Sequence, residues 1–158
     1  MNMIFDELSA SLPSAEVTVR IVLRLLAALL AGGIIGLQRE TTGKAAGLRT
    51  HMLVCAGTAL FVLAAVNAGM EQDAISRVVQ GLATGIGFLG AGAILKVESS
   101  NQIKGLTTAA GIWMTAALGV TIGVGQLGTA AIGTALAWFV LAVLIKVDKR
   151  IDGSADRA

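Results

Sequence analysis

Five apolar stretches of about 20 residues each constrain the fold of this chain more than any other feature of its sequence. They cover residues 21–37, 50–68, 75–95, 105–124 and 127–147, and most charged side chains lie between or beyond them. A helix that crosses a bilayer needs roughly 20 consecutive, mainly apolar residues. The sequence therefore predicts an all-α fold, a polytopic membrane bundle of five transmembrane helices.

The composition supports this prediction and leaves little room for a second domain. Hydrophobic side chains make up 55% of the 158 residues, the mean hydropathy is +0.80, and only 14% of residues are charged. A soluble domain carries about 25% charged residues. We expect a short N-terminal surface segment over residues 1–19, a transmembrane domain over 20–147 and a cytoplasmic tail over 148–158.

The distribution of Lys and Arg predicts how the bundle is oriented. Short loops rich in these residues stay on the cytoplasmic side of a membrane. Nine of the twelve basic residues fall on one predicted side, namely Arg39, Lys44, Arg49, Lys96, Lys104, Lys146, Lys149, Arg150 and Arg157. The N-terminus is therefore expected outside and the C-terminus in the cytoplasm.

Glycine is abundant within the predicted helices, often at a spacing of four. Small residues at this spacing allow two helices in a membrane to approach closely. We predict helix packing at Gly32, Gly36, Gly81, Gly85, Gly87, Gly90 and Gly92. An alternative for the glycine-dense stretch 75–95 is a broken helix, as found at the midplane of transporters.

Polar residues gather at the predicted cytoplasmic helix ends. The proposed functional cluster consists of Arg39, Glu40, Arg49, Thr50 and Thr107. Glu40 is expected to pair with Arg39 or Arg49, because a short loop brings the first two helices together. The alternative is that the basic residues are only positive-inside anchors. His51 is interpreted as an interfacial or capping residue, and Arg24 as a side chain that reaches the outer interface.

Several function classes find no support in the residue pattern. The single cysteine, Cys55, excludes a disulfide framework and a multi-cysteine metal site. No catalytic set of Ser, His and Asp, or of Cys and His, is within plausible reach. We therefore predict no catalytic residues, no metal site, no cofactor and no nucleic-acid partner, and a protein that is not an enzyme.

Four runs of residues, in order along the chain, resemble the signature runs of the MgtC/SapB family of membrane proteins. They are GLQRE at 36–40, AGLRT at 46–50, GIGFLGAG at 85–92 and GLTTAA at 105–110. The resemblance covers about residues 20–147, which is the membrane domain. The ACT-like soluble domain that many members carry after it has no counterpart before Ala158.

The resemblance implies a multi-pass protein of the bacterial inner membrane. The best-known member of this virulence-related family is linked to growth in low magnesium, to survival in macrophages and to inhibition of the F-type ATP synthase. We therefore expect a non-enzymatic regulator that packs its helices against a partner, such as that synthase, and that forms a homo-oligomer in the lipid bilayer. The alternative is a channel or transporter for Mg²⁺ or another cation, although no Asp or Glu lies in the middle of a predicted helix.

The predicted orientation can be tested by labelling engineered cysteines in intact cells. Cysteines that replace Lys44, Lys96 or Arg157 should resist a membrane-impermeant thiol reagent, and one that replaces Asp73 should react. Labelling at Lys44 from outside the cell would overturn the orientation.

Overall fold

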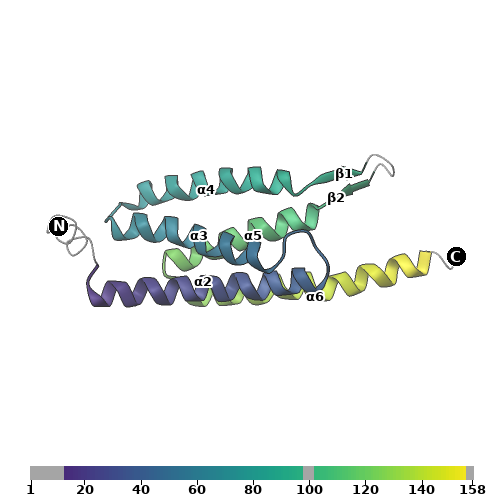
Figure 1. Ribbon diagram of the computed structural model, residues 1–158, viewed down its shortest axis with the longest axis horizontal. Coiled ribbons are helices and arrows are strands. Elements are labelled where there is room, and N and C mark those ends of the chain that lie inside the picture. Colours follow the sequence, from purple (N-terminus) through teal and green to yellow (C-terminus); the bar gives the residue numbers. More distant parts are fainter. Residues whose placement is uncertain (1–12, 98–101, 156–158) are drawn as a thin grey trace, which may run out of the picture.

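The computed structural model describes residues 13–97 and 102–155 and shows five long helices (Figure 1). Each is long and apolar enough to cross a membrane, which confirms the predicted multi-pass helical fold. The helices are α2 (Ala15–Thr41), α3 (Leu48–Asn67), α4 (Gln72–Gly92), α5 (Leu106–Gly123) and α6 (Leu127–Ala155). Most of the predicted N-terminal segment and the last three residues of the predicted tail lie outside the described ranges.

The helices run up and down along the long axis of the molecule, so their connections alternate between its two ends (Figure 1). The α2–α3 connection and the α4–α5 connection lie at the same end, which is the predicted cytoplasmic end. The α4–α5 connection includes a short antiparallel hairpin of β1 (Leu95–Val97) and β2 (Gln102–Lys104). α4 is one unbroken helix, so the alternative of a broken glycine-rich helix is not what the structure shows.

Helix α3 packs against both α2 and α5, and glycines make these contacts close. A Cβ atom added to Gly32 of α2 would lie 2.5 Å from the carbonyl oxygen of His51. One added to Gly36 would lie 2.7 Å from the Cα atom of Leu48. Only glycine fits where helix backbones approach this closely, and such approach supplies the dispersion contacts that hold membrane helices together.

The other face of α3 meets glycines of α5. A Cβ atom added to Gly123 would lie 2.7 Å from the Cβ of Val62, and one at Gly119 would collide with Thr58 and the Cys55 carbonyl. Cys55 itself is fully buried in the core that α2, α3, α5 and α6 share. Helices α2, α3 and α5 therefore form the tightly packed centre of the bundle.

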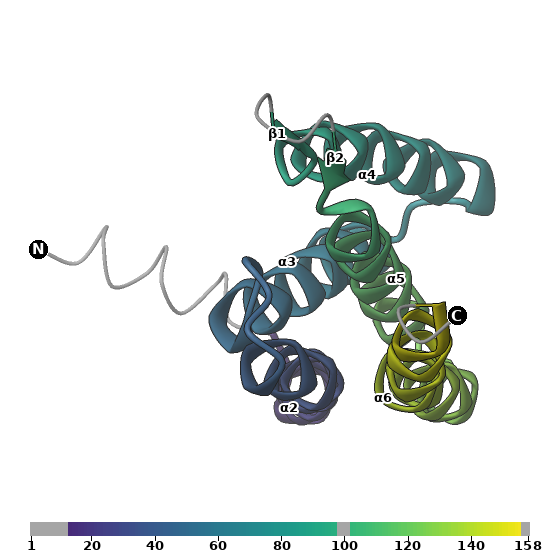
Figure 2. The same cartoon turned by 90° about the vertical axis from the view of Figure 1, so that its right-hand side faces the viewer.

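Helix α4 lies at the edge of the bundle, inclined to the other helices (Figure 2). Only Ile86 and Gly90 of α4 are buried, and a Cβ atom at Gly90 would meet the Ala109 side chain at an ordinary 3.7 Å. A Cβ atom added to any of the remaining α4 glycines of the packing prediction would meet no other part of the described structure within 4 Å, namely at Gly81, Gly85, Gly87 and Gly92. Within one copy of the chain, the predicted close packing is therefore present at Gly32 and Gly36 and absent at these four positions.

This difference predicts how the two groups of glycines respond to substitution. Gly36→Leu forces the α2 and α3 backbones apart, so we expect loss of about 2 kcal/mol or more of stability. Gly87→Leu places the same side chain in open space and should leave stability nearly unchanged. Thermal unfolding of both purified variants in mild detergent measures the difference, and equal unfolding temperatures would contradict the packing.

Candidate functional site

Four polar side chains are buried within the apolar bundle near its predicted cytoplasmic end. Gln38 and Arg39 belong to α2, His51 belongs to α3 and Thr108 to α5. The exposed fraction is 1% for Arg39 and 0% for His51. Ionisable groups at membrane depth are costly and usually mark function, so we take this group as the centre of the candidate site.

The position of Arg39 follows from the helical periodicity of α2. Ala28, Gly32, Ile35 and Arg39 are three or four residues apart and all are buried, so they share the face that meets α3 and α5. The Nη2 atom of Arg39 donates a hydrogen bond to the hydroxyl of Thr108 at 3.0 Å. Its Nε has no hydrogen-bond partner in the described part of the chain. Arg39 is thus a buried cation with unused hydrogen-bonding capacity.

His51 and Gln38 are each only partly satisfied. The Nδ1 atom of His51 lies 2.9 Å from the Gly47 carbonyl, which requires the proton on that nitrogen. Gln38 donates from Nε2 to the Leu141 carbonyl of α6 at 2.8 Å. His51 Nε2 and Gln38 Oε1 are buried without a partner in the described structure. His51, interpreted from the sequence as an interfacial or capping residue, has its ring buried inside the helix packing near the start of α3.

Glu40 does not form the ion pair that the sequence predicted. Its Oε2 accepts a hydrogen bond from the backbone N–H of Leu48 at 2.7 Å, at the first turn of α3. The described residues contain one salt bridge, Arg20 with Glu16, so no bridge joins Glu40 to Arg39 or Arg49. A carboxylate at this position satisfies a free N–H group and the positive end of the helix dipole. Glu40 therefore joins α2 to α3 as a helix cap.

The rest of the predicted cluster is divided between two environments. Arg49 and Thr50 are exposed, with no side-chain hydrogen bond to another described residue. Thr107 is also exposed, but it lines a cavity of about 580 Å³ that Arg39 and Thr108 line as well. The structure thus brings Arg39 and Thr107 together and leaves Glu40, Arg49 and Thr50 outside this cavity.

Arg24, at the opposite end of the bundle, also bonds within the protein. Its Nη1 donates to the Gly123 carbonyl at 2.9 Å, at the last turn of α5. Arg24 was predicted to reach the outer interface, and the structure adds a hydrogen bond at that end of the bundle, to a carbonyl that has no partner within its own helix. Arginines of α2 therefore contact α5 near both of its ends.

Sequence reasoning missed Gln38 and the buried state of His51 as parts of the site, and it placed Thr107 in the cluster in preference to Thr108. For Arg39 a signal was present, because it continues the small-residue face of Gly32 and Gly36 at helical spacing. Thr108 follows Thr107, and a helix turns 100° per residue, so only a known contact face tells the two apart. No group of three His, Cys, Asp or Glu residues suited to a metal ion is found among the described residues.

Comparison with known proteins agrees with this membrane architecture. Residues 25–150 match the MgtC family. The chain is therefore a multi-pass membrane protein of α-helices, and it belongs to the MgtC family. No solved structure matches it significantly.

Three relatives show the extent of the similarity. Protein SrpB of Synechococcus elongatus is 48% identical over 122 residues, which is 70% of this chain and 67% of SrpB. The "Putative magnesium transporter YhiD" of Escherichia coli K12 is 41% identical over 144 residues, 85% of this chain and 65% of YhiD. Protein MgtC of Salmonella typhimurium is 39% identical over 131 residues, 83% of this chain and 55% of MgtC. The matched region thus spans about half to two thirds of these relatives.

The different surroundings of Arg39 and Arg49 predict different responses to the same substitution. Arg39→Lys keeps the charge but loses the planar fork that reaches Thr108, and we expect it to cost about 1–3 kcal/mol of stability. Arg49→Lys, on the surface at the same end of the bundle, is the matched control and should be silent. Unfolding temperature and membrane level report both, and an unaffected Arg39→Lys variant would argue against the buried contact.

Proposed function

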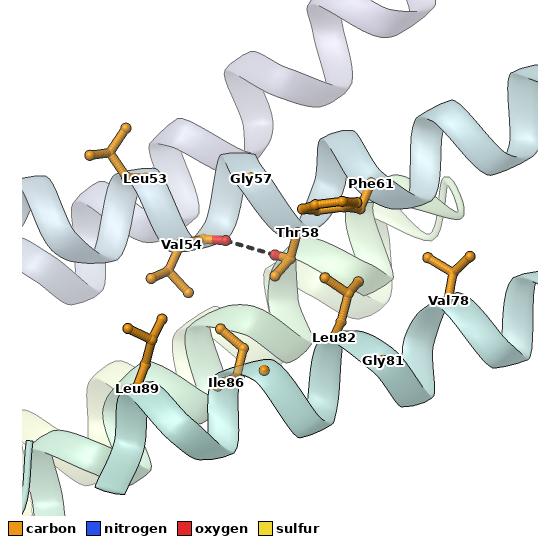
Figure 3. A pocket seen from close by; sticks show the side chains of 11 residues that line it. Leu53, Val54, Gly57, Thr58, Phe61, Val78, Gly81, Leu82, Ile86 and Leu89 are labelled. Carbon is orange, nitrogen blue, oxygen red and sulfur yellow. Dashed lines mark hydrogen bonds between the residues drawn. The ribbon is translucent and has the colours of Figure 1, made fainter. Parts of the chain in front are cut away.

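We propose that this protein is a non-enzymatic regulator of the bacterial inner membrane that binds a transmembrane helix of a partner along α4. The observation that carries the proposal is an apolar groove between α3 and α4 with open glycines in its wall (Figure 3). Membrane helices associate where small residues permit close approach. A groove of this kind is a docking surface for another helix.

The groove has a volume of about 620 Å³ and is almost entirely apolar. Its walls consist of Leu53, Val54, Gly57, Thr58, Phe61, Val78, Gly81, Leu82, Gly85, Ile86 and Leu89. The hydroxyl of Thr58 donates to the Val54 carbonyl at 2.8 Å, so the polar side chain in the wall is satisfied by its own helix (Figure 3). An apolar helix can therefore bind here without leaving a polar group unpaired.

The glycines give the groove its capacity for close contact. A Cβ atom added to Gly57, Gly81 or Gly85 would meet no other part of the described structure within 4 Å, although glycines elsewhere in the bundle touch another helix backbone. Bulky side chains, among them Leu82 and Phe61, stand beside them (Figure 3). This combination of ridges and open backbone is what a second helix fills in a membrane interface.

Transport of a cation is the second candidate, favoured by the name of the relative YhiD, a "Putative magnesium transporter". Mg²⁺ is bound by oxygen ligands and retains several waters, so a path for it is expected to present carboxylates. The described membrane helices place Asp and Glu only near their ends, and α4 is unbroken. These features favour regulation over transport.

The proposed physiological role is inferred from the family resemblance. A role in magnesium limitation or membrane energetics follows from it, and the F-type ATP synthase is one membrane complex that could supply the partner helix. A second copy of the chain is the alternative occupant, since a homo-oligomer would also cover the glycines. Identifying the protein that contacts the groove distinguishes the partner complex from a second copy of the chain.

A pair of glycine substitutions in α4 tests the proposal. Gly85→Leu fills the groove and should reduce recovery of the partner in mild detergent about tenfold, because the helices can no longer approach closely. Gly87→Leu adds the same bulk outside the groove and should retain the partner. Growth of each variant in low magnesium should change in parallel with its recovery of the partner.

Two results would count against this function. Equal recovery and growth with Gly85→Leu and Gly87→Leu would show that the groove is not the docking surface. If a photo-crosslinker at residue 85 captures only a second copy of the chain, the groove serves self-association and not the binding of a partner. Uptake of Mg²⁺ by vesicles that contain the purified protein alone would favour the transporter.

A further inference from the structure

A second candidate surface lies at the predicted cytoplasmic end, away from the α3–α4 groove. It is the cavity of about 580 Å³ between the α2–α3 connection, the β hairpin and the first turn of α5. We call it the Arg39 cavity. Its lining residues are Arg39, Gly43, Lys44, Ala45, Ala93, Ile103, Lys104, Gly105, Leu106, Thr107 and Thr108.

The charges around the Arg39 cavity have one sign. Arg39, Lys44 and Lys104 line it, and no Asp or Glu is among its described lining residues. Lys44 and Lys104 are exposed, so their ammonium groups are able to turn toward a ligand, whereas Arg39 is 1% exposed and fixed by Thr108. Three cations around one cavity favour a negatively charged occupant.

Arg39 supplies the observation that points to a ligand rather than to a solvated basic surface. A buried cation without a counter-charge costs several kcal/mol, so such groups are normally paired. Arg39 forms no salt bridge to a described residue, and its Nε has no hydrogen-bond partner. The neighbouring carboxylate of Glu40 is occupied by the Leu48 N–H. An anion in the cavity would provide the missing partner.

The first turn of α5 adds hydrogen-bond donors at the same place. Gly105 is the N-cap residue, and its φ of +95° belongs to the left-handed region that favours glycine. A Cβ atom there would also collide with the Ala93 carbonyl, so no Ser, Thr or Asp can cap this helix from position 105. The N–H groups that begin α5 therefore have no side-chain cap from this position, and residues 105–108 line the cavity. The N-terminus of a helix favours an anion.

We propose that the Arg39 cavity binds a phosphate group. The guanidinium fork of Arg39 matches the planar, bidentate recognition of phosphate oxygens, and Lys44 and Lys104 neutralise the remaining charge. The cavity is at a helix end, where a lipid headgroup and a free phosphate compound are both within reach. The shared chemistry is the phosphate group, and the experiment separates its two sources.

The test uses the full chain, purified in a neutral detergent and stripped of bound lipid. Its unfolding temperature is measured with inorganic phosphate against chloride at equal ionic strength, and with phosphatidylglycerol against phosphatidylcholine in mixed micelles. Stabilisation by inorganic phosphate identifies a free phosphate compound as the source. Stabilisation by phosphatidylglycerol alone identifies an anionic lipid headgroup.

Variants of the exposed lysines test binding of the probe without removing a buried side chain. Lys44→Gln combined with Lys104→Gln should weaken binding of the effective probe about tenfold. Arg49→Gln removes an exposed charge from the same end but outside the cavity, and it should bind like the wild type. No stabilisation by either probe, or an equal response of the double variant and the wild type, would overturn the phosphate site.

Discussion

The close approach of α3 to the backbones of α2 and α5 is the constraint on which the rest of the structure depends. Gly32 and Gly36 on one side, and Gly119 and Gly123 on the other, leave no space for a side chain. Lipid supplies no hydrophobic force between helices, so this contact area must provide the association energy. Helices α4 and α6 pack around this centre, α4 against α3 and α5 and α6 against α2 and α5.

Hydrogen bonds between helices complete this packing, because the hydrocarbon core offers no water to unpaired polar groups. Arg24 reaches the last carbonyl of α5, Gln38 reaches α6, and Glu40 caps α3. The contacts of Arg24 and Glu40 lie near helix ends, where backbone groups lack partners within their own helix, whereas Gln38 bonds to Leu141 within α6. Arg39 differs from them, since it is buried at a helix end and retains an unused donor.

The two surfaces proposed for function use opposite chemistry and lie on different parts of the bundle. The α3–α4 groove is apolar, and it exists because α4 contacts the centre mainly through Ile86 and Gly90. The Arg39 cavity is basic, and it forms where the α2–α3 connection meets the start of α5. A partner helix and a phosphate group would therefore bind without competing for the same residues.

The sequence by itself determined the five membrane helices and their order, because a span depends on about 20 local apolar residues. It also predicted the close packing at Gly32 and Gly36, but it treated Gly81, Gly85, Gly87 and Gly92 alike, since spacing does not reveal which small face meets a neighbour. Likewise, the sequence predicted an ion pair between Glu40 and an arginine because their charges are opposite. In the structure, Glu40 instead accepts a hydrogen bond from the Leu48 N–H. Only the tertiary structure decided these partners, because contacts between helices depend on their rotation and tilt, which are set by the packing of the whole bundle.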